Sequence, residues 1–143
     1  MVKDQAYVVP KKSLFNRIIG DGNFELEFAK FLDNCNDVIS YAKNFLAVNF
    51  KLDYVNSGGN IANYYPDFLV KLSGKRIVVV ETKGHEEIDL PLKMERLRAW
   101  CNDVNRSQSD VTYEFVFIDQ VGFDKYKPKS FKQLLDGFMD YKD

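Results

Sequence analysis

The fold is decided by residues 63–84, which read Asn63-Tyr-Tyr-Pro-Asp-Phe-Leu-Val-Lys-Leu-Ser-Gly-Lys-Arg-Ile-Val-Val-Val-Glu-Thr-Lys-Gly84. Two apolar segments flank the dipeptide Ser73-Gly74, which is typical of a tight turn. Both segments are apolar on both faces over much of their length, as central strands covered on two sides are. The second contains the aliphatic run from Ile77 to Val80 and ends in Glu81-Thr82-Lys83. Because burying an unpaired charge is costly, charged groups at the end of a buried strand indicate a function.

Outward from this hairpin, the hydrophobic periodicity predicts one mixed β-sheet flanked by helices, an α/β fold. Residues 1–22 are weakly patterned and are predicted to be an N-terminal connector, followed by a single domain over residues 23–143. The expected order is helix, strand, strand, strand, helix, strand and a closing helix. In residue numbers, we expect a helix from Asn23, strands over 44–55, 64–72 and 75–83, a helix over 89–105, a strand over 113–121 and a helix over 130–141.

Composition excludes several classes of protein. The chain has 143 residues, of which 45% are hydrophobic, and a net charge of −1, so it has material for one core but no global basic field that attracts nucleic acid. Cys35 and Cys101 stand outside any metal-binding spacing and are expected to be buried free thiols, and His85 as the single histidine excludes a multi-histidine zinc site. The sequence shows neither a signal peptide nor an apolar run of about 18 residues, so we expect a cytoplasmic protein with no membrane span.

The charged groups of the hairpin converge only in one strand register. Side chains alternate along a strand, so Glu81 and Lys83 point the same way. A two-residue turn at Ser73-Gly74 pairs Asp67 with Val80 and sends its carboxylate to the opposite face. A three-residue turn pairs Asp67 with Glu81 and brings all three groups together, because a one-residue slip changes the face. A shared site therefore predicts an odd-numbered loop or a bulge in this hairpin.

If the groups converge, their chemistry is that of a metal-assisted hydrolase. Two adjacent carboxylates, Asp67 and Glu81, repel each other, and a hard cation such as Mg²⁺ relieves this with oxygen ligands. The backbone carbonyl of Thr82 is a natural further oxygen ligand. The ammonium of Lys83 would stabilise charge that develops on a phosphoryl group. Glu25, in the first turn of the first predicted helix, is either an outer metal ligand or a surface charge that the helix dipole favours.

The ordered set of motifs resembles the PD-(D/E)XK nuclease superfamily, and most closely the C-terminal endonuclease domain of the Res subunit of type III restriction enzymes. That resemblance implies a restriction-endonuclease-like fold and a Mg²⁺-dependent endonuclease that hydrolyses DNA phosphodiester bonds, with Mn²⁺ as a substitute. The resemblance covers roughly residues 23–119. Its motifs are Asn23-Phe-Glu-Leu-Glu-Phe-Ala-Lys-Phe-Leu32, Val38 through Ala42-Lys43-Asn44, Tyr64-Tyr-Pro-Asp-Phe68, Glu81-Thr-Lys-Gly84, and Lys93 followed by Trp100-Cys101 and Asn105.

By resemblance, Asp67 and Glu81 are metal ligands and catalytic residues, and Lys83 is the catalytic lysine. Glu25 carries over as the acidic residue of the first helix, although Glu27 competes for that role. Lys93 matches a basic position on the helix after the motif, where it is either a phosphate contact or a solvated charge.

Resemblance also implies partners. They are double-stranded DNA, a translocase or helicase region, a methyltransferase subunit that reads the sequence, and a second copy of the chain, since cutting two strands needs two sites. This chain lacks a Gly-rich phosphate loop and so carries no ATP site. It is therefore read as a nuclease part of a Res subunit or as a stand-alone relative. Two alternatives remain open: a catalytically inactive DNA-binding or scaffolding domain of the same fold, and an interaction domain in which the three charged groups form only a structural ion pair.

Overall fold

The computed structural model describes residues 7–8, 11–12, 18–19, 23–44, 50–83 and 87–142. A four-stranded sheet in the order β3-β6-β7-β8 forms its centre, with β8 parallel to β7 and the other neighbours antiparallel. This mixed sheet with flanking helices confirms the predicted fold class. The elements are β1 (Tyr7–Val8), β2 (Ile18–Ile19), α1 (Asn23–Asn34), β3 (Val38–Lys43), β4 (Leu52–Val55), β5 (Ile61–Tyr64), β6 (Phe68–Leu72), β7 (Arg76–Lys83), α2 (Leu90–Ser107), β8 (Thr112–Asp119), α3 (Gln120–Tyr126) and α4 (Phe131–Gly137).

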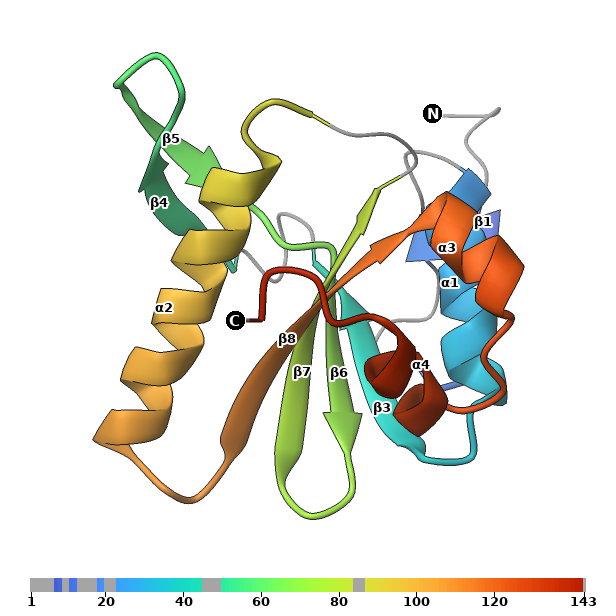
Figure 1. Ribbon diagram of the computed structural model, residues 1–143. Helices are drawn as coiled ribbons and strands as arrows, with labels where there is room; N and C mark the ends of the chain where they lie inside the picture. The colour runs from blue at the N-terminus through green and yellow to red at the C-terminus, as the bar shows by residue number, and fades with distance from the viewer. Residues whose placement is uncertain are drawn as a thin grey trace.

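Helices cover both faces of the sheet (Figure 1). One face packs against α1, α3 and α4, and the other against α2 and the β4–β5 hairpin. β7 contributes side chains to the hydrophobic cores on both faces of the sheet. Val78 and Val80 point into the first core, on the side of α1, α3 and α4, and Val79 points into the second, on the side of α2. All three are fully buried. The aliphatic run is therefore buried on both sides, as its sequence predicts, and only its charged end reaches the edge of the sheet.

The predicted strand over 44–55 is wrong in position. The sheet strand next to β6 is β3, and β4 instead pairs with β5 in a separate two-stranded ribbon. The alternation of β4 is genuine, because Leu52 and Tyr54 are buried, but it packs against α2 and does not join the sheet. β3 lacks a clear period of two, since it contains a register shift between Val38 and Ser40. Residues 45–49 of the predicted strand lie outside the described residues.

The predicted strand over 64–72 is divided in the structure. β5 ends at Tyr64 and β6 begins at Phe68, with Pro66 between them, which has no backbone N–H to give to a sheet. The predicted strand over 113–121 also ends earlier, at Asp119, because the Asp119 carboxylate accepts a hydrogen bond from the Gly122 N–H and caps α3. The last helix is shorter than expected and ends at Gly137.

Other expectations concern the chain outside the sheet. Within residues 1–22, β1 pairs with β2, and the N–H groups of Lys11 and Lys12 donate to Asp33 Oδ1 at 2.9 and 3.0 Å. Cys35 and Cys101 are free and buried as predicted, and burial raises the pKa of each thiol to about 12. Among the described residues, no helix combines the length and the apolar character that crossing a membrane requires.

Candidate active site

The β6–β7 hairpin has a three-residue loop. Phe68 pairs with Val80 and Leu72 with Arg76, which leaves residues 73–75 unpaired at the turn. Gly74 and Lys75 take positive φ angles of 75° and 59°, and three-residue hairpin loops use such a left-handed position to close. This is the odd-numbered loop that a shared site requires.

Asp67 lies directly before β6, at the charged end of β7. Its N–H donates to the Val80 carbonyl oxygen at 3.0 Å, and its Oδ2 accepts from both the N–H and the hydroxyl of Thr82 at 2.8 Å. Burial and the negative charge of Glu25 raise the pKa of Asp67 to about 6, although the Thr82 hydrogen bonds and Lys43 oppose the shift. The carboxylate is therefore held in a defined orientation but is costly to ionise.

Glu81 is almost completely buried, with 1% of its surface exposed. Its Oε1 accepts from the Tyr64 hydroxyl at 2.9 Å, and its Oε2 lies 3.0 Å from Lys83 Nζ. Burial and the neighbouring Asp67 raise the pKa of Glu81 to about 8, against the attraction of Lys83. Burial lowers the pKa of Lys83, but attraction to Glu81 and Glu87 reverses this and raises it. The structure thus brings the three charged groups of the sequence motif together.

Two further residues hold this arrangement, and the sequence motifs contain them without indicating a role. Tyr64 is buried, and its hydroxyl orients Glu81. The buried amide of Asn44 donates to the carbonyl oxygens of Pro66 at 2.8 Å and Phe50 at 2.6 Å, while the Asn44 N–H donates to the Asp67 carbonyl oxygen at 2.7 Å. Asn44 therefore ties the turn that carries Asp67 to the end of β3. The sequence shows only a tyrosine two residues before Pro66 and an amide residue after β3, and neither residue type by itself indicates these roles.

Glu25 reaches the same edge of the sheet from α1. Its carboxylate lies 3.5 Å from the ammonium of Lys43, which also sits 5.7 Å from the ring centre of Phe68. Glu27, the competing residue, is exposed and faces Asp124, and burial together with Asp124 raises its pKa. The geometry therefore favours Glu25 over Glu27 as the helix carboxylate beside Asp67.

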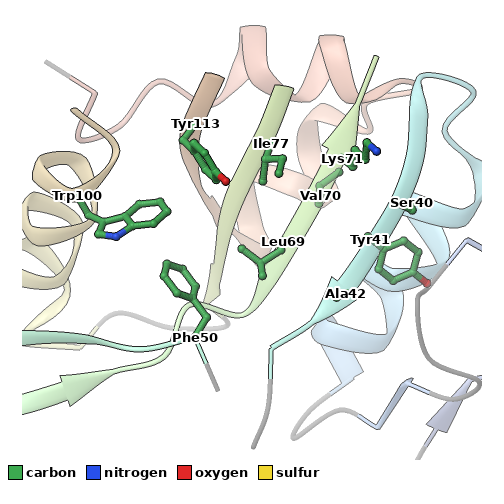
Figure 2. A pocket seen from close by; sticks show the side chains of 10 residues that line it. All are labelled: Ser40, Tyr41, Ala42, Phe50, Leu69, Val70, Lys71, Ile77, Trp100 and Tyr113. Atoms are coloured by element: carbon green, nitrogen blue, oxygen red, sulfur yellow. The ribbon is translucent and has the colours of Figure 1, made fainter. Parts of the chain in front are cut away.

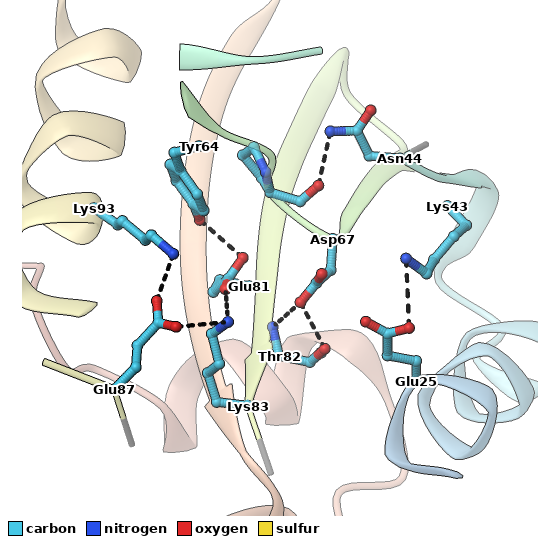
Figure 3. Close-up of polar contacts among 11 residues, drawn as sticks. Glu25, Lys43, Asn44, Tyr64, Asp67, Glu81, Thr82, Lys83, Glu87 and Lys93 are labelled. Atoms are coloured by element: carbon cyan, nitrogen blue, oxygen red, sulfur yellow. Dashed lines mark hydrogen bonds and ion pairs between the residues drawn. The ribbon is translucent and has the colours of Figure 1, made fainter. Parts of the chain in front are cut away.

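A second lysine borders the site from α2 (Figure 3). Lys93 Nζ lies 2.5 Å from Glu87 Oε1, and Lys83 Nζ lies 3.7 Å from Glu87 Oε2. The Lys93 ammonium also stands 5.9 Å and 5.6 Å from the ring centres of Tyr54 and Tyr64, within cation–π range. Attraction to the two lysines outweighs burial and lowers the pKa of Glu87. His85 lies outside the described residues.

A family model described as an endonuclease domain matches residues 11–120, more than half of the chain. The chain belongs to this endonuclease domain family. No curated protein and no solved structure matches it.

The donor set of this endonuclease domain suits a hard divalent cation. Glu81 is a buried and Asp67 a part-buried oxygen donor, and burial together with a neighbouring carboxylate raises the pKa of each despite the opposing hydrogen bonds and lysines. No three acidic, histidine or cysteine side chains of the described residues converge as a metal cluster. This pattern fits Mg²⁺, which binds through one or two carboxylates and keeps several waters, better than it fits a cation that needs a full protein cage.

Away from this edge, an apolar groove of about 450 Å³ follows the sheet beside α2 (Figure 2). Phe50, Trp100 and Tyr113 line it, with ring centres 5.0 Å apart for the first two and 5.3 Å for the last two. Trp100 is half-buried and packs against the second core. The groove is lined almost entirely by apolar groups and contributes no charged group to the active-site edge.

Proposed function

We propose that this endonuclease domain is a Mg²⁺-dependent nuclease with a PD-(D/E)XK site that hydrolyses DNA phosphodiester bonds. The observation that carries the proposal is the convergence of Asp67, Glu81 and Lys83 at one edge of the sheet in a member of an endonuclease domain family. A purely structural ion pair accounts for Lys83 and Glu81, but it leaves Asp67 as a second, part-buried carboxylate whose charge repels that of Glu81. A divalent cation would remove this repulsion.

Asp67, Glu81 and the Thr82 backbone carbonyl would hold the ion, with Mn²⁺ able to replace Mg²⁺. The Thr82 N–H points toward Asp67, and the N–H and carbonyl of one strand residue face the same side, which supports the carbonyl as a third ligand. Glu25 would contribute through water, because its carboxylate pairs with Lys43. When bound, the cation would lower the pKa of a coordinated water and neutralise charge on the phosphate.

Protein side chains would complete the reaction. Lys83 is partly exposed and 3.0 Å from Glu81, so its ammonium can face both the attacking water and a phosphate oxygen at the rim. Tyr64 would keep Glu81 oriented while the charges around it change. Lys93 would contact a phosphate beside the reacting one.

For the biological context, we propose double-stranded DNA as substrate and a cytoplasmic restriction-modification system as setting, with the chain acting as the nuclease part of a type III Res subunit or as a stand-alone relative. The near-neutral net charge of −1 supports a need for DNA capture by other parts of such a system, namely a translocase and a methyltransferase. A homodimer would supply one site for each strand.

The test is nicking of supercoiled plasmid by the purified chain in Mg²⁺, Mn²⁺ or EDTA. We expect metal-dependent nicking that Lys83→Ala abolishes and Lys132→Ala, a change in an exposed ion pair with Asp136, leaves intact. Calorimetric titration with Mn²⁺ separates the alternatives. Binding lost in Asp67→Asn without nicking by the wild type would indicate an inactive domain of the same fold, and absence of metal binding would indicate a structural ion pair.

A further inference from the structure

Glu87 forms ion pairs with two lysines, Lys83 and Lys93, next to the proposed metal ligands. The Glu87 carboxylate directs one oxygen toward each ammonium, at 3.7 Å and 2.5 Å. These three side chains form the rim of the active site, and each is partly exposed, with 35% of the Glu87 side chain open to solvent. The Glu87 carboxylate therefore lies between the ammonium groups of Lys83 and Lys93 at the rim of the site (Figure 3).

We propose that Lys83 and Lys93 form a phosphate-binding site and that Glu87 is its internal anion, which a phosphodiester of the substrate displaces. A phosphodiester also offers two charged oxygens on one centre, so it can replace the carboxylate at both lysines. Identification of the ligand as DNA rests on the proposed function. The geometric claim, that Glu87 occupies an anion site, does not.

The surroundings of Lys93 support a site built for an anion. Lys93 lies in the first turn of α2, where the helix dipole disfavours a cation, and that turn contains no acidic residue. The rings of Tyr54 and Tyr64 hold its ammonium at the rim. Two aromatic rings thus fix the ammonium of a lysine that stands against the helix dipole, next to the N-cap residue Asp89.

Glu87 is also positioned by the start of α2. Its carbonyl oxygen accepts from the Leu90 N–H at 3.2 Å, so its backbone belongs to the turn that leads into the helix. The side chain can leave the lysines without breaking that turn. Neutralising Glu87 should therefore expose the phosphate site while the backbone around it is retained.

The experiment measures binding of a short DNA duplex of arbitrary sequence to Glu87→Gln by fluorescence anisotropy in EDTA, where no cleavage occurs. The matched control is Glu114→Gln. Glu114 pairs with Arg76 at the far end of β7, its side chain is 32% exposed, and the substitution makes the same change in net charge. We expect Glu87→Gln to bind at least about 3-fold tighter than wild type, with a steeper salt dependence by about one phosphate contact, and Glu114→Gln to stay close to wild type.

Affinity of Glu87→Gln equal to that of Glu114→Gln, or weaker than wild type, overturns the inference. So does a lower kcat with an unchanged KM for DNA, because that pattern belongs to a residue that positions the catalytic lysine. The same experiments distinguish failure of this inference from failure of the proposed nuclease function. Tighter DNA binding by Glu87→Gln, without metal-dependent nicking by the wild type, would support the phosphate site and contradict the nuclease function.

Discussion

Replacing Glu81 by glutamine should stabilise the metal-free protein at pH values above about 5. Between the ordinary pKa of 4.5 and the folded value of about 8, the folded state holds a proton on Glu81 that the unfolded chain has released. The free energy of unfolding therefore falls as the pH rises through this window. Asp67, whose pKa is raised to about 6, acts in the same direction at lower pH.

The size of the effect follows from that window. At pH 7 the penalty extends over about 2.5 pH units at about 1.4 kcal/mol each, which is about 3 kcal/mol. Glutamine keeps the size of the side chain and an acceptor for the Tyr64 hydroxyl, but it has no charge to bury. We therefore expect Glu81→Gln to exceed wild type by about 3 kcal/mol at about pH 7, and the two proteins to converge near about pH 5.

Urea unfolding in EDTA, followed by tryptophan fluorescence across this pH range, measures the difference. Glu95→Gln, on the exposed side of α2, is the matched control and should parallel wild type. Mg²⁺ should restore the stability of wild type at high pH and have little effect on Glu81→Gln. Parallel pH profiles for wild type and Glu81→Gln, or a variant less stable than wild type near pH 8, would refute the reasoning that Glu81 is a strained buried carboxylate.

Two other predictions concern the residues that hold the carboxylates. Tyr64→Phe removes the hydrogen bond to Glu81 and should weaken Mn²⁺ binding about 10-fold by calorimetry. The control Tyr41→Phe removes the hydroxyl of an equally buried tyrosine away from the site and should leave metal affinity unchanged. Equal losses of affinity would argue against an orienting role for Tyr64. Asn44→Ala removes the side-chain hydrogen bonds that hold the Asp67 turn and should lower the free energy of unfolding by about 2–4 kcal/mol in urea titrations. A change below about 0.5 kcal/mol would show that the turn is stable without these hydrogen bonds.

Local periodicity accounts for the part of the fold that could be predicted. The alternation around the β6–β7 hairpin predicts two central strands, and the structure buries Val78, Val79 and Val80 from both sides. The helical spacing over α2 likewise places Met94 and Leu97 in the core. The sheet strand predicted over 44–55 was wrong, and β3 was not predicted, because periodicity shows that a segment has a buried face but not which neighbour covers it.

Of the candidate site, the sequence by itself determined the pair Glu81 and Lys83, because side chains two residues apart on a strand share a side regardless of the rest of the fold. It left the position of Asp67 open between two loop lengths, and the tertiary structure decided it through the three-residue turn. Only the folded chain brings Tyr64, Asn44 and Glu87 to the same edge. The reason is physical: backbone geometry sets local order, whereas contacts between distant segments depend on how the helices and strands pack.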